Sequence, residues 1–152
     1  MFNNRWSILA LLFVVHMSTG IQYQAVASLS PLLMSDLSLT FSDIGLLIGL
    51  YHAPGIVLAF PGGAIGARLG DTRTVSIGLV FMIVGEVMTA TASTWPVLVG
   101  ARVVAGAGSI LLNVMVIKMV ADWFAGKETA TAMGIIGNSS PAGIALALVT
   151  IP

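Results

Sequence analysis

Cysteine is absent from this chain of 152 residues, and charged residues make up only 8% of it. Without cysteine, disulfide frameworks, thiolate zinc sites and cysteine nucleophiles are excluded. The two histidines, His16 and His52, lie far apart with no carboxylate beside them, so no metal site is expected. Phosphate-binding loops and hydrolase serine elbows are also missing. We therefore expect no enzyme activity and no cofactor.

Charge is scarce and balanced, with six basic residues, six acidic residues and no basic run. Nucleic-acid binding needs clustered lysine and arginine, so nucleic acid is not an expected partner. A soluble domain carries about 25% charged residues, whereas 57% of this chain is hydrophobic. So little polar surface predicts that the lipid bilayer is the solvent of this protein.

Five apolar runs dominate the chain, and each is long enough to cross a bilayer. They predict transmembrane spans over about residues 6–27, 43–67, 74–92, 96–120 and 129–152. For the first run a signal peptide is the competing interpretation, with Arg5 at its start and a cleavage site at residues 25–27. Its apolar core is longer than the ~7–15 residues of a signal peptide, and further spans follow. The predicted fold is an all-α membrane protein.

Turn signals separate these runs. Residues 31–40 read as a short connector, after which Thr40 and Asp43 have the spacing of a capping box at the start of a helix. Pro54 and Pro61 are expected to kink the second span. The basic residues outside the spans are Arg5, Arg68, Arg73, Lys118 and Lys127. Alternating topology places all of them on one side, which predicts a cytoplasmic N-terminus in an inner membrane.

Two charged residues lie within spans. Glu86 is six residues before Ala92, and Arg102 is six residues after Pro96, so both lie about 9 Å from the same end of adjacent antiparallel helices. A charge near the bilayer centre costs about 2.5–3.5 kcal/mol even on permissive scales. One interpretation is a structural ion pair. The other assigns Arg102 to an anionic substrate and Glu86 to a coupled proton.

Several neutral polar side chains and the two histidines also fall on the spans. Any one of them can be explained by a hydrogen bond between helices. Their presence on several spans at once instead favours a shared polar cavity, in which histidine can also carry a proton. The candidates for substrate binding, with Arg102, are His16, Gln22, Tyr23, His52, Asn113 and Asn138.

A glycine-rich stretch joins the second and third spans, with the sequence FPGGAIGARLGDTR at residues 60–73. It resembles the loop between helices 2 and 3 of major facilitator superfamily transporters, roughly G-x-L-A-D-R-x-G-R-R. Five positions agree with that pattern, namely Gly63, Ile65, Gly66, Arg68 and Gly70. Ala67 replaces the usual aspartate, and Asp71 stands where a basic residue is usual.

In the family this loop is thought to lock the inner gate through charge pairs. The resemblance therefore implies a gating role for Gly63, Gly66, Arg68, Gly70, Asp71, Arg73 and Asp122. Because Ala67 is neutral, such a lock would have to pair Arg68, Asp71 or Arg73 with a group such as Asp122.

Two further motifs support the resemblance. Arg102, Gly106 and Gly108 match the family's R-x-x-x-G-x-G pattern in helix 4. The stretch from Asn138 to Gly143 departs from the G-x-x-x-G-P-x-x-G pattern of drug and sugar antiporters. Together with the Pro-Gly-Gly at residues 61–63, it is similar to the cyanate, nitrite and nitrate porters.

Membership implies twelve helices in two halves, with substrate held between the halves. The chain would supply five helices of the six-helix N-terminal half, truncated, and the missing C-terminal half would be its partner. Helices 1 and 4 would line the cavity and helix 3 would be scaffold, which favours a structural Glu86. The predicted function is a proton-driven secondary carrier for a small anion or polar metabolite. The alternatives are a drug or metabolite efflux antiporter and a non-transporting sensor or assembly protein.

Overall fold

The computed structural model describes residues 5–126 and 128–151, and this part of the chain consists of helices and short turns without any strand. Lys127 and Pro152, which belong to the orientation and last-span predictions, lie outside the described residues. The helices are α1 (Arg5–Ser28), α2 (Ser30–Leu37), α3 (Phe41–His52), α4 (Pro54–Leu69), α5 (Asp71–Ala90), α6 (Trp95–Trp123), α7 (Thr129–Gly137) and α8 (Ser139–Thr150).

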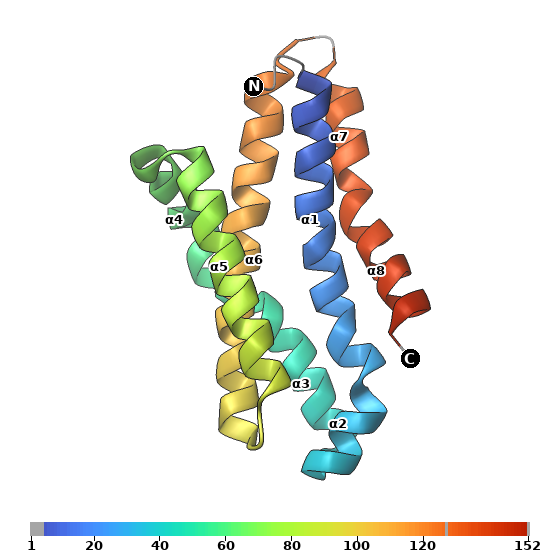
Figure 1. Ribbon diagram of the computed structural model, residues 1–152. Helices are drawn as coiled ribbons and strands as arrows, with labels where there is room; N and C mark the ends of the chain where they lie inside the picture. The colour runs from blue at the N-terminus through green and yellow to red at the C-terminus, as the bar shows by residue number, and fades with distance from the viewer. Residues whose placement is uncertain (1–4, 127, 152) are drawn as a thin grey trace.

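Five segments are long and apolar enough to cross a membrane, so the described part of the chain forms an all-α, multi-pass membrane protein. They are Arg5–Ser28, Phe41–Leu69, Asp71–Ala90, Trp95–Trp123 and Thr129–Thr150. The second consists of α3 followed by α4, and the fifth of α7 followed by α8. The long axes run roughly along one direction, with turns at both ends of the bundle (Figure 1).

The stretch expected to be a plain connector after the first span contains a helix instead. Pro31 lies in the first turn of α2, where its missing N–H needs no partner, so the proline starts a helix here. Ser38 ends α2 in a left-handed conformation, with φ of 53°. The predicted capping box is present, since Thr40 Oγ1 accepts from the Asp43 N–H and Asp43 Oδ2 accepts from the Thr40 N–H.

Prolines mark the interruptions in the second and fifth spans. Pro54 lies in the first turn of α4, directly after α3, and Pro61 lies inside α4. In the fifth span α7 ends at Gly137, and Pro141 lies in the first turn of α8. Because proline has no N–H to donate to the residue four positions earlier, the hydrogen-bond ladder is interrupted at each of these points. Each of the two spans can therefore bend at its interruption.

The central helix of the bundle is α6, which packs against α3, α4 and α5 and makes smaller contacts with α1 and α7. The second extensive packing joins α1 to α8, on the other side of α6 (Figure 1). Small residues permit the closest crossings. A Cβ at Gly143 of α8 would collide with the Met17 carbonyl of α1, and one at Gly106 of α6 would collide with the Tyr51 carbonyl of α3.

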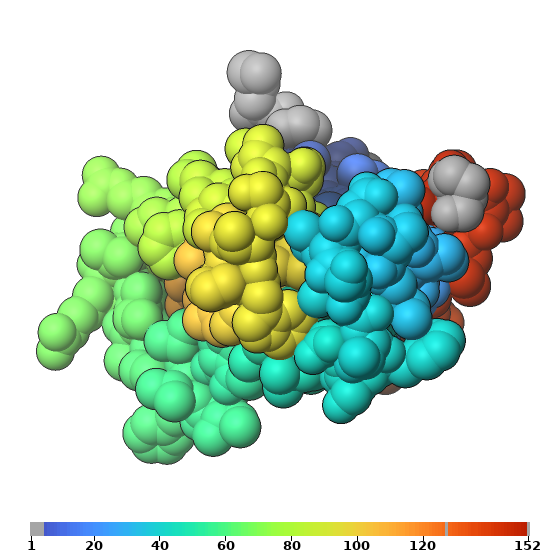
Figure 2. Space-filling view, turned by 90° about the horizontal axis from the view of Figure 1, so that it is seen from below, coloured from blue at the N-terminus to red at the C-terminus, as the bar shows by residue number. Residues whose placement is uncertain are grey.

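An apolar cluster closes the end of the bundle that contains α2. Val26, Ile44, Leu47 and Leu98 form its buried centre. Figure 2 shows the same end from outside, where α2 and the start of α3 lie beside the turn between α5 and α6. This packing holds the ends of three spans together.

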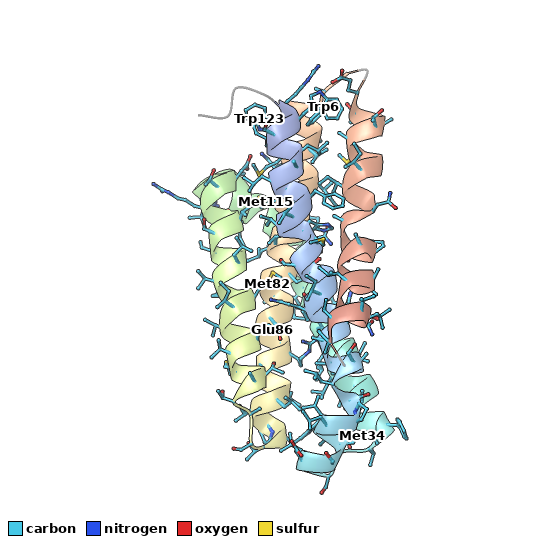
Figure 3. The ribbon with its side chains drawn as sticks, turned by 45° about the vertical axis from the view of Figure 1, so that its right-hand side comes forward. Trp6, Met34, Met82, Glu86, Met115 and Trp123 are labelled. Atoms are coloured by element: carbon cyan, nitrogen blue, oxygen red, sulfur yellow. The ribbon has the colours of Figure 1, made fainter. Side chains whose placement is uncertain are left out.

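Much of the outer surface is apolar, as contact with lipid requires. Phe60 is 96% exposed, and Ile56 and Val149 are almost as exposed. Trp6 and Trp123 both lie at the end of the bundle opposite Met34 (Figure 3). Partly exposed tryptophans are favoured at the membrane–water interface, so these two residues mark one boundary of the membrane-embedded region.

Candidate functional site

Arg102 is completely buried on α6 and joins three neighbouring helices. Its Nη1 lies 3.2 Å from Glu86 Oε1 of α5. Its Nε points at the Leu47 carbonyl of α3, at 3.5 Å, and both terminal nitrogens approach the Gln22 carbonyl of α1, also at 3.5 Å. The five donors of a guanidinium suit such a junction because they point in fixed, divergent directions.

The aromatic ring of Tyr51 covers one face of this guanidinium, with Arg102 Cζ 4.6 Å from the ring centroid. The Tyr51 hydroxyl donates to the Thr19 carbonyl of α1 at 3.3 Å. Together these contacts surround the guanidinium with protein groups. Of the two interpretations of Arg102 and Glu86, the geometry favours the structural ion pair.

Beyond Tyr51 lies a small cavity of about 170 Å³. Side chains from α1, α3, α6 and α8 line it, and most of them are polar but uncharged. The lining residues are Thr19, Tyr23, Tyr51, His52, Ser109, Ile110, Asn113, Ser140 and Ile144. The rings of Tyr23 and His52 meet edge to face, with centroids 5.1 Å apart. The cavity can therefore offer hydroxyl, amide and imidazole groups to a small polar molecule.

His16 lies just outside the cavity lining, one helical turn before Thr19, and is only 7% exposed. Its Nδ1 is 2.6 Å from Ser139 Oγ at the start of α8. The side chain of Asn113, which does line the cavity, lies beside the same ring. His16 thus connects α1 to the break between α7 and α8.

The remaining polar candidates fall in different places. Gln22 is half-buried, and its side-chain Oε1 has no hydrogen-bond partner among the described residues. Asn138 is exposed and donates from Nδ2 to the Gly134 carbonyl of its own span at 2.7 Å. Neither of them lines the cavity. The structure thus brings together Tyr23, His52 and Asn113, with His16 adjacent, and leaves Asn138 apart.

Sequence reasoning missed Thr19, Tyr51, Ser109 and Ser140 as lining residues. A helical spacing rule identifies two of them. Thr19 is four residues before Tyr23 and Ser109 is four residues before Asn113, so each pair shares one helix face. For Tyr51 and Ser140 no comparable signal exists, because they lie next to the interruptions in their spans.

The predicted gating stretch ends α4 and begins α5. Gly70 has φ of 85°, a conformation that favours glycine, and this residue turns the chain between the two helices. Asp71 then accepts from Lys118 Nζ of α6 through both carboxylate oxygens, at 2.9 Å. The same Nζ lies 2.9 Å from Asp122. Lys118 therefore joins the two carboxylates.

The expectation that Asp122 meets Arg68, Asp71 or Arg73 directly does not match this arrangement, since Asp71 and Asp122 share a lysine instead. Arg68 and Arg73 are exposed, and neither forms an ion pair within residues 5–126 and 128–151. They lie on either side of the α4–α5 turn, which protrudes from the bundle (Figure 1).

These features define a class of protein: a multi-pass helical membrane protein with an ion pair at a buried arginine and a polar cavity lined by four of its spans. Residues 12–151 match the Major Facilitator Superfamily. The chain belongs to this family.

Two relatives show the range of functions among similar sequences. The quinolone resistance protein NorA of Staphylococcus aureus is 27% identical over 135 residues, which cover 89% of this chain and 34% of NorA. The hexuronate transporter of Bacillus subtilis is 24% identical over 139 residues, covering 91% of this chain and 33% of that protein. The chain thus spans about one third of the length of these relatives. Neither relative supports the cyanate, nitrite and nitrate branch.

Proposed function

We propose that this chain forms the N-terminal part of a secondary active transporter for a small polar metabolite, with a substrate site at the cavity among α1, α3, α6 and α8. One observation carries the proposal: four spans contribute hydroxyl, amide and imidazole groups to one partly open cavity of about 170 Å³. Buried polar groups in a lipid-embedded bundle are costly, so their collection in one place indicates a binding site.

The side chains that are free to bind a substrate indicate its chemical class. Arg102 already contacts Glu86, Tyr51 and two backbone carbonyls, so it stabilises the fold. It does not line the cavity, but it holds Tyr51, which does. The cavity itself presents neutral donors and acceptors, which suit a hydroxyl-bearing molecule or an anion bound by hydrogen bonds. Similarity to a hexuronate transporter agrees with such a substrate.

The complete transporter needs a second helical half that closes the substrate site from the other side. In this proposal the N-terminus faces the cytoplasm of a cell with the protein in its inner membrane, and transport is coupled to protons. The assignment to cyanate, nitrite and nitrate porters rests on the stretch from Asn138 to Gly143 and on the Pro-Gly-Gly at residues 61–63.

Drug efflux is the second candidate function. The similarity to a quinolone resistance protein favours it, as does the cluster of aromatic rings from Tyr23, Tyr51 and His52 beside the cavity. An aromatic cluster can stack against a flat apolar ligand as well as hydrogen-bond a polar one.

Transport by the full-length protein in proteoliposomes tests both functions. With a proton gradient imposed, we expect saturable uptake of a sugar acid such as a hexuronate and no transport of a fluorescent amphipathic dye. Dye transport without sugar-acid uptake would support efflux. An absence of saturable flux for either compound would favour the sensor or assembly alternative.

Two asparagines provide a matched pair of variants for the same assay. Asn113→Ala removes an amide from the cavity wall, so KM should rise several-fold. Asn138→Ala removes an exposed amide that bonds its own helix, so KM should stay near the wild-type value. Equal effects in the two variants would count against the cavity as the substrate site.

A further inference from the structure

His16 combines features that the substrate site alone does not explain. It lies in the middle of α1 and is only 7% exposed. One ring nitrogen, Nδ1, contacts Ser139, which begins α8 after the break between α7 and α8. The other ring nitrogen, Nε2, is buried and has no hydrogen bond of acceptable geometry within the described part of the chain. The neighbouring groups determine which ring nitrogen of His16 carries the hydrogen in the neutral form.

Ser139 determines the tautomer. Its hydroxyl oxygen lies 2.5 Å from the Ile136 carbonyl and 2.6 Å from His16 Nδ1. A carbonyl only accepts, so the single hydroxyl hydrogen of Ser139 must point to Ile136. The short contact to the ring then requires His16 Nδ1 to carry a hydrogen and donate it to Ser139 Oγ. In the neutral imidazole, Nε2 consequently has no hydrogen and holds a free lone pair.

We propose that His16 Nε2 is a proton-binding site that couples proton movement to the substrate cavity and to the α7–α8 break. This inference rests on the proposed transport function. A hydronium ion from the cavity gives its proton to the Nε2 lone pair, which leaves an imidazolium and a water molecule, and the proton departs by the reverse step. Asn113 lies beside the ring and lines the cavity, so its amide oxygen can accept from the new Nε2–H.

The other ionisable groups around α1 do not offer an equivalent site. No ionisable side chain lies on α7 or α8. On α6, Arg102 is paired with Glu86, and Lys118 and Asp122 lie in the last two turns, paired with each other. Asp36 of α2, which is exposed, and Asp43 of α3, which is partly exposed, lie at the opposite end. His52 of α3 is exposed and in this differs from the buried ring of His16.

Protonation changes two interactions at once. The positive charge formed behind the cavity wall favours an anionic or strongly polar substrate, so proton and substrate binding reinforce each other. The hydrogen bond from Nδ1 to Ser139 becomes charge-assisted and therefore stronger. Because Ser139 begins α8 directly after the break, this bond holds α8 against α1 more firmly in the protonated state.

Ring spectra of the histidines test the site without any need for substrate. The full-length protein is labelled with 15N-histidine, and His16→Gln identifies the signals of His16. We expect the Nδ1–H tautomer at high pH and conversion to imidazolium as the pH is lowered. Ser139→Ala should shift these signals selectively. A ring that stays neutral throughout, or that shows the Nε2–H tautomer, would overturn the proposal.

Transport measurements test the coupling itself. In proteoliposomes, His16→Gln should lose accumulation driven by a pH gradient while substrate counterflow, which needs no net proton movement, continues. His52→Gln is the matched control, and it should still respond to the gradient even if its KM rises. Gradient-driven accumulation retained in His16→Gln would refute the coupling role. If the wild type moves no substrate, the proposed function fails, and the ring spectra still decide whether His16 binds a proton.

Discussion

The guanidinium of Arg102 has no exposed surface and lies in the membrane-embedded part of the bundle. A charge in such a place is stable only when its donors have acceptors. Glu86 supplies one, and the carbonyls of Leu47 and Gln22 supply the others. Each acceptor comes from a different helix, so one side chain holds α1, α3 and α5 against α6.

Replacing Arg102 by alanine should destabilise the protein by about 3–5 kcal/mol, because Glu86 loses its partner and two carbonyls lose a donor. Arg102→Lys should recover only part of this loss, since an ammonium cannot reproduce the divergent donors. Thermal unfolding in detergent measures the effect. Arg73→Ala, which removes an exposed arginine without an ion pair in the described residues, is the control. Equal midpoints for the two alanine variants would contradict the structural role of Arg102.

At the scale of elements, the crossing of α1 and α8 depends on two glycines. A Cβ at Gly143 would collide with the Met17 carbonyl, and one at Gly20 would collide with the Ser140 carbonyl. Both obstacles are backbone atoms, so neither can move aside as a side chain would. The same crossing holds His16 beside Ser139.

Gly143→Ala should therefore push α8 away from α1 and destabilise the protein by about 1–3 kcal/mol. Gly134→Ala, in the same span, places its methyl group in open space and should be neutral or slightly stabilising. Thermal unfolding midpoints of the two variants provide the comparison. The prediction is wrong if Gly143→Ala unfolds at the wild-type temperature.

At the scale of the whole molecule, charge is concentrated at one end of the bundle. The start of α1, the α4–α5 turn and the α6–α7 turn all lie there (Figure 1). Arg5 pairs with Glu128 at 2.8 Å, and Lys118 joins Asp71 to Asp122. The first of these bonds connects α1 to the start of the last span, and the bonds of Lys118 connect α5 to α6, without burying any of the charges fully.

Lys118→Gln should loosen this end while leaving the fold intact, because exposed ion pairs add little to stability. A cysteine introduced at Ser109, in the cavity wall, should then react faster with a membrane-impermeant maleimide from the charged side. This part of the protein contains no native cysteine that would compete. Arg73→Gln should leave the labelling rate unchanged. The same rate in both variants would argue against a gate at Lys118.

Orientation in the membrane can be tested separately. Basic residues at the charged end predict that this end faces the cytoplasm. A cysteine at Ser93, in the α5–α6 turn, should be labelled in intact cells, whereas one at Ala125, beyond α6, should react only after permeabilisation. Both positions are exposed. The reverse pattern would show that the protein has the opposite topology.

The amino-acid sequence by itself determined the membrane class, the five helical spans and the family. Each of these depends on local properties: apolar runs of sufficient length, capping residues such as Thr40 and Asp43, and the glycine–arginine motifs. The equal depths of Glu86 and Arg102 also followed from counting residues along two adjacent helices. The helix at residues 30–37 was missed because Pro31 can begin a helix as readily as it can interrupt one.

Tertiary structure decided which polar residues act together. Tyr51 covers Arg102, Lys118 joins Asp71 to Asp122, and Ser139 meets His16 from 123 residues away. These contacts depend on how helices rotate and cross, which is set by the packing of small residues on facing helices. Helical periodicity predicts which residues share one face of a helix, but only the packed bundle shows which two helix faces meet.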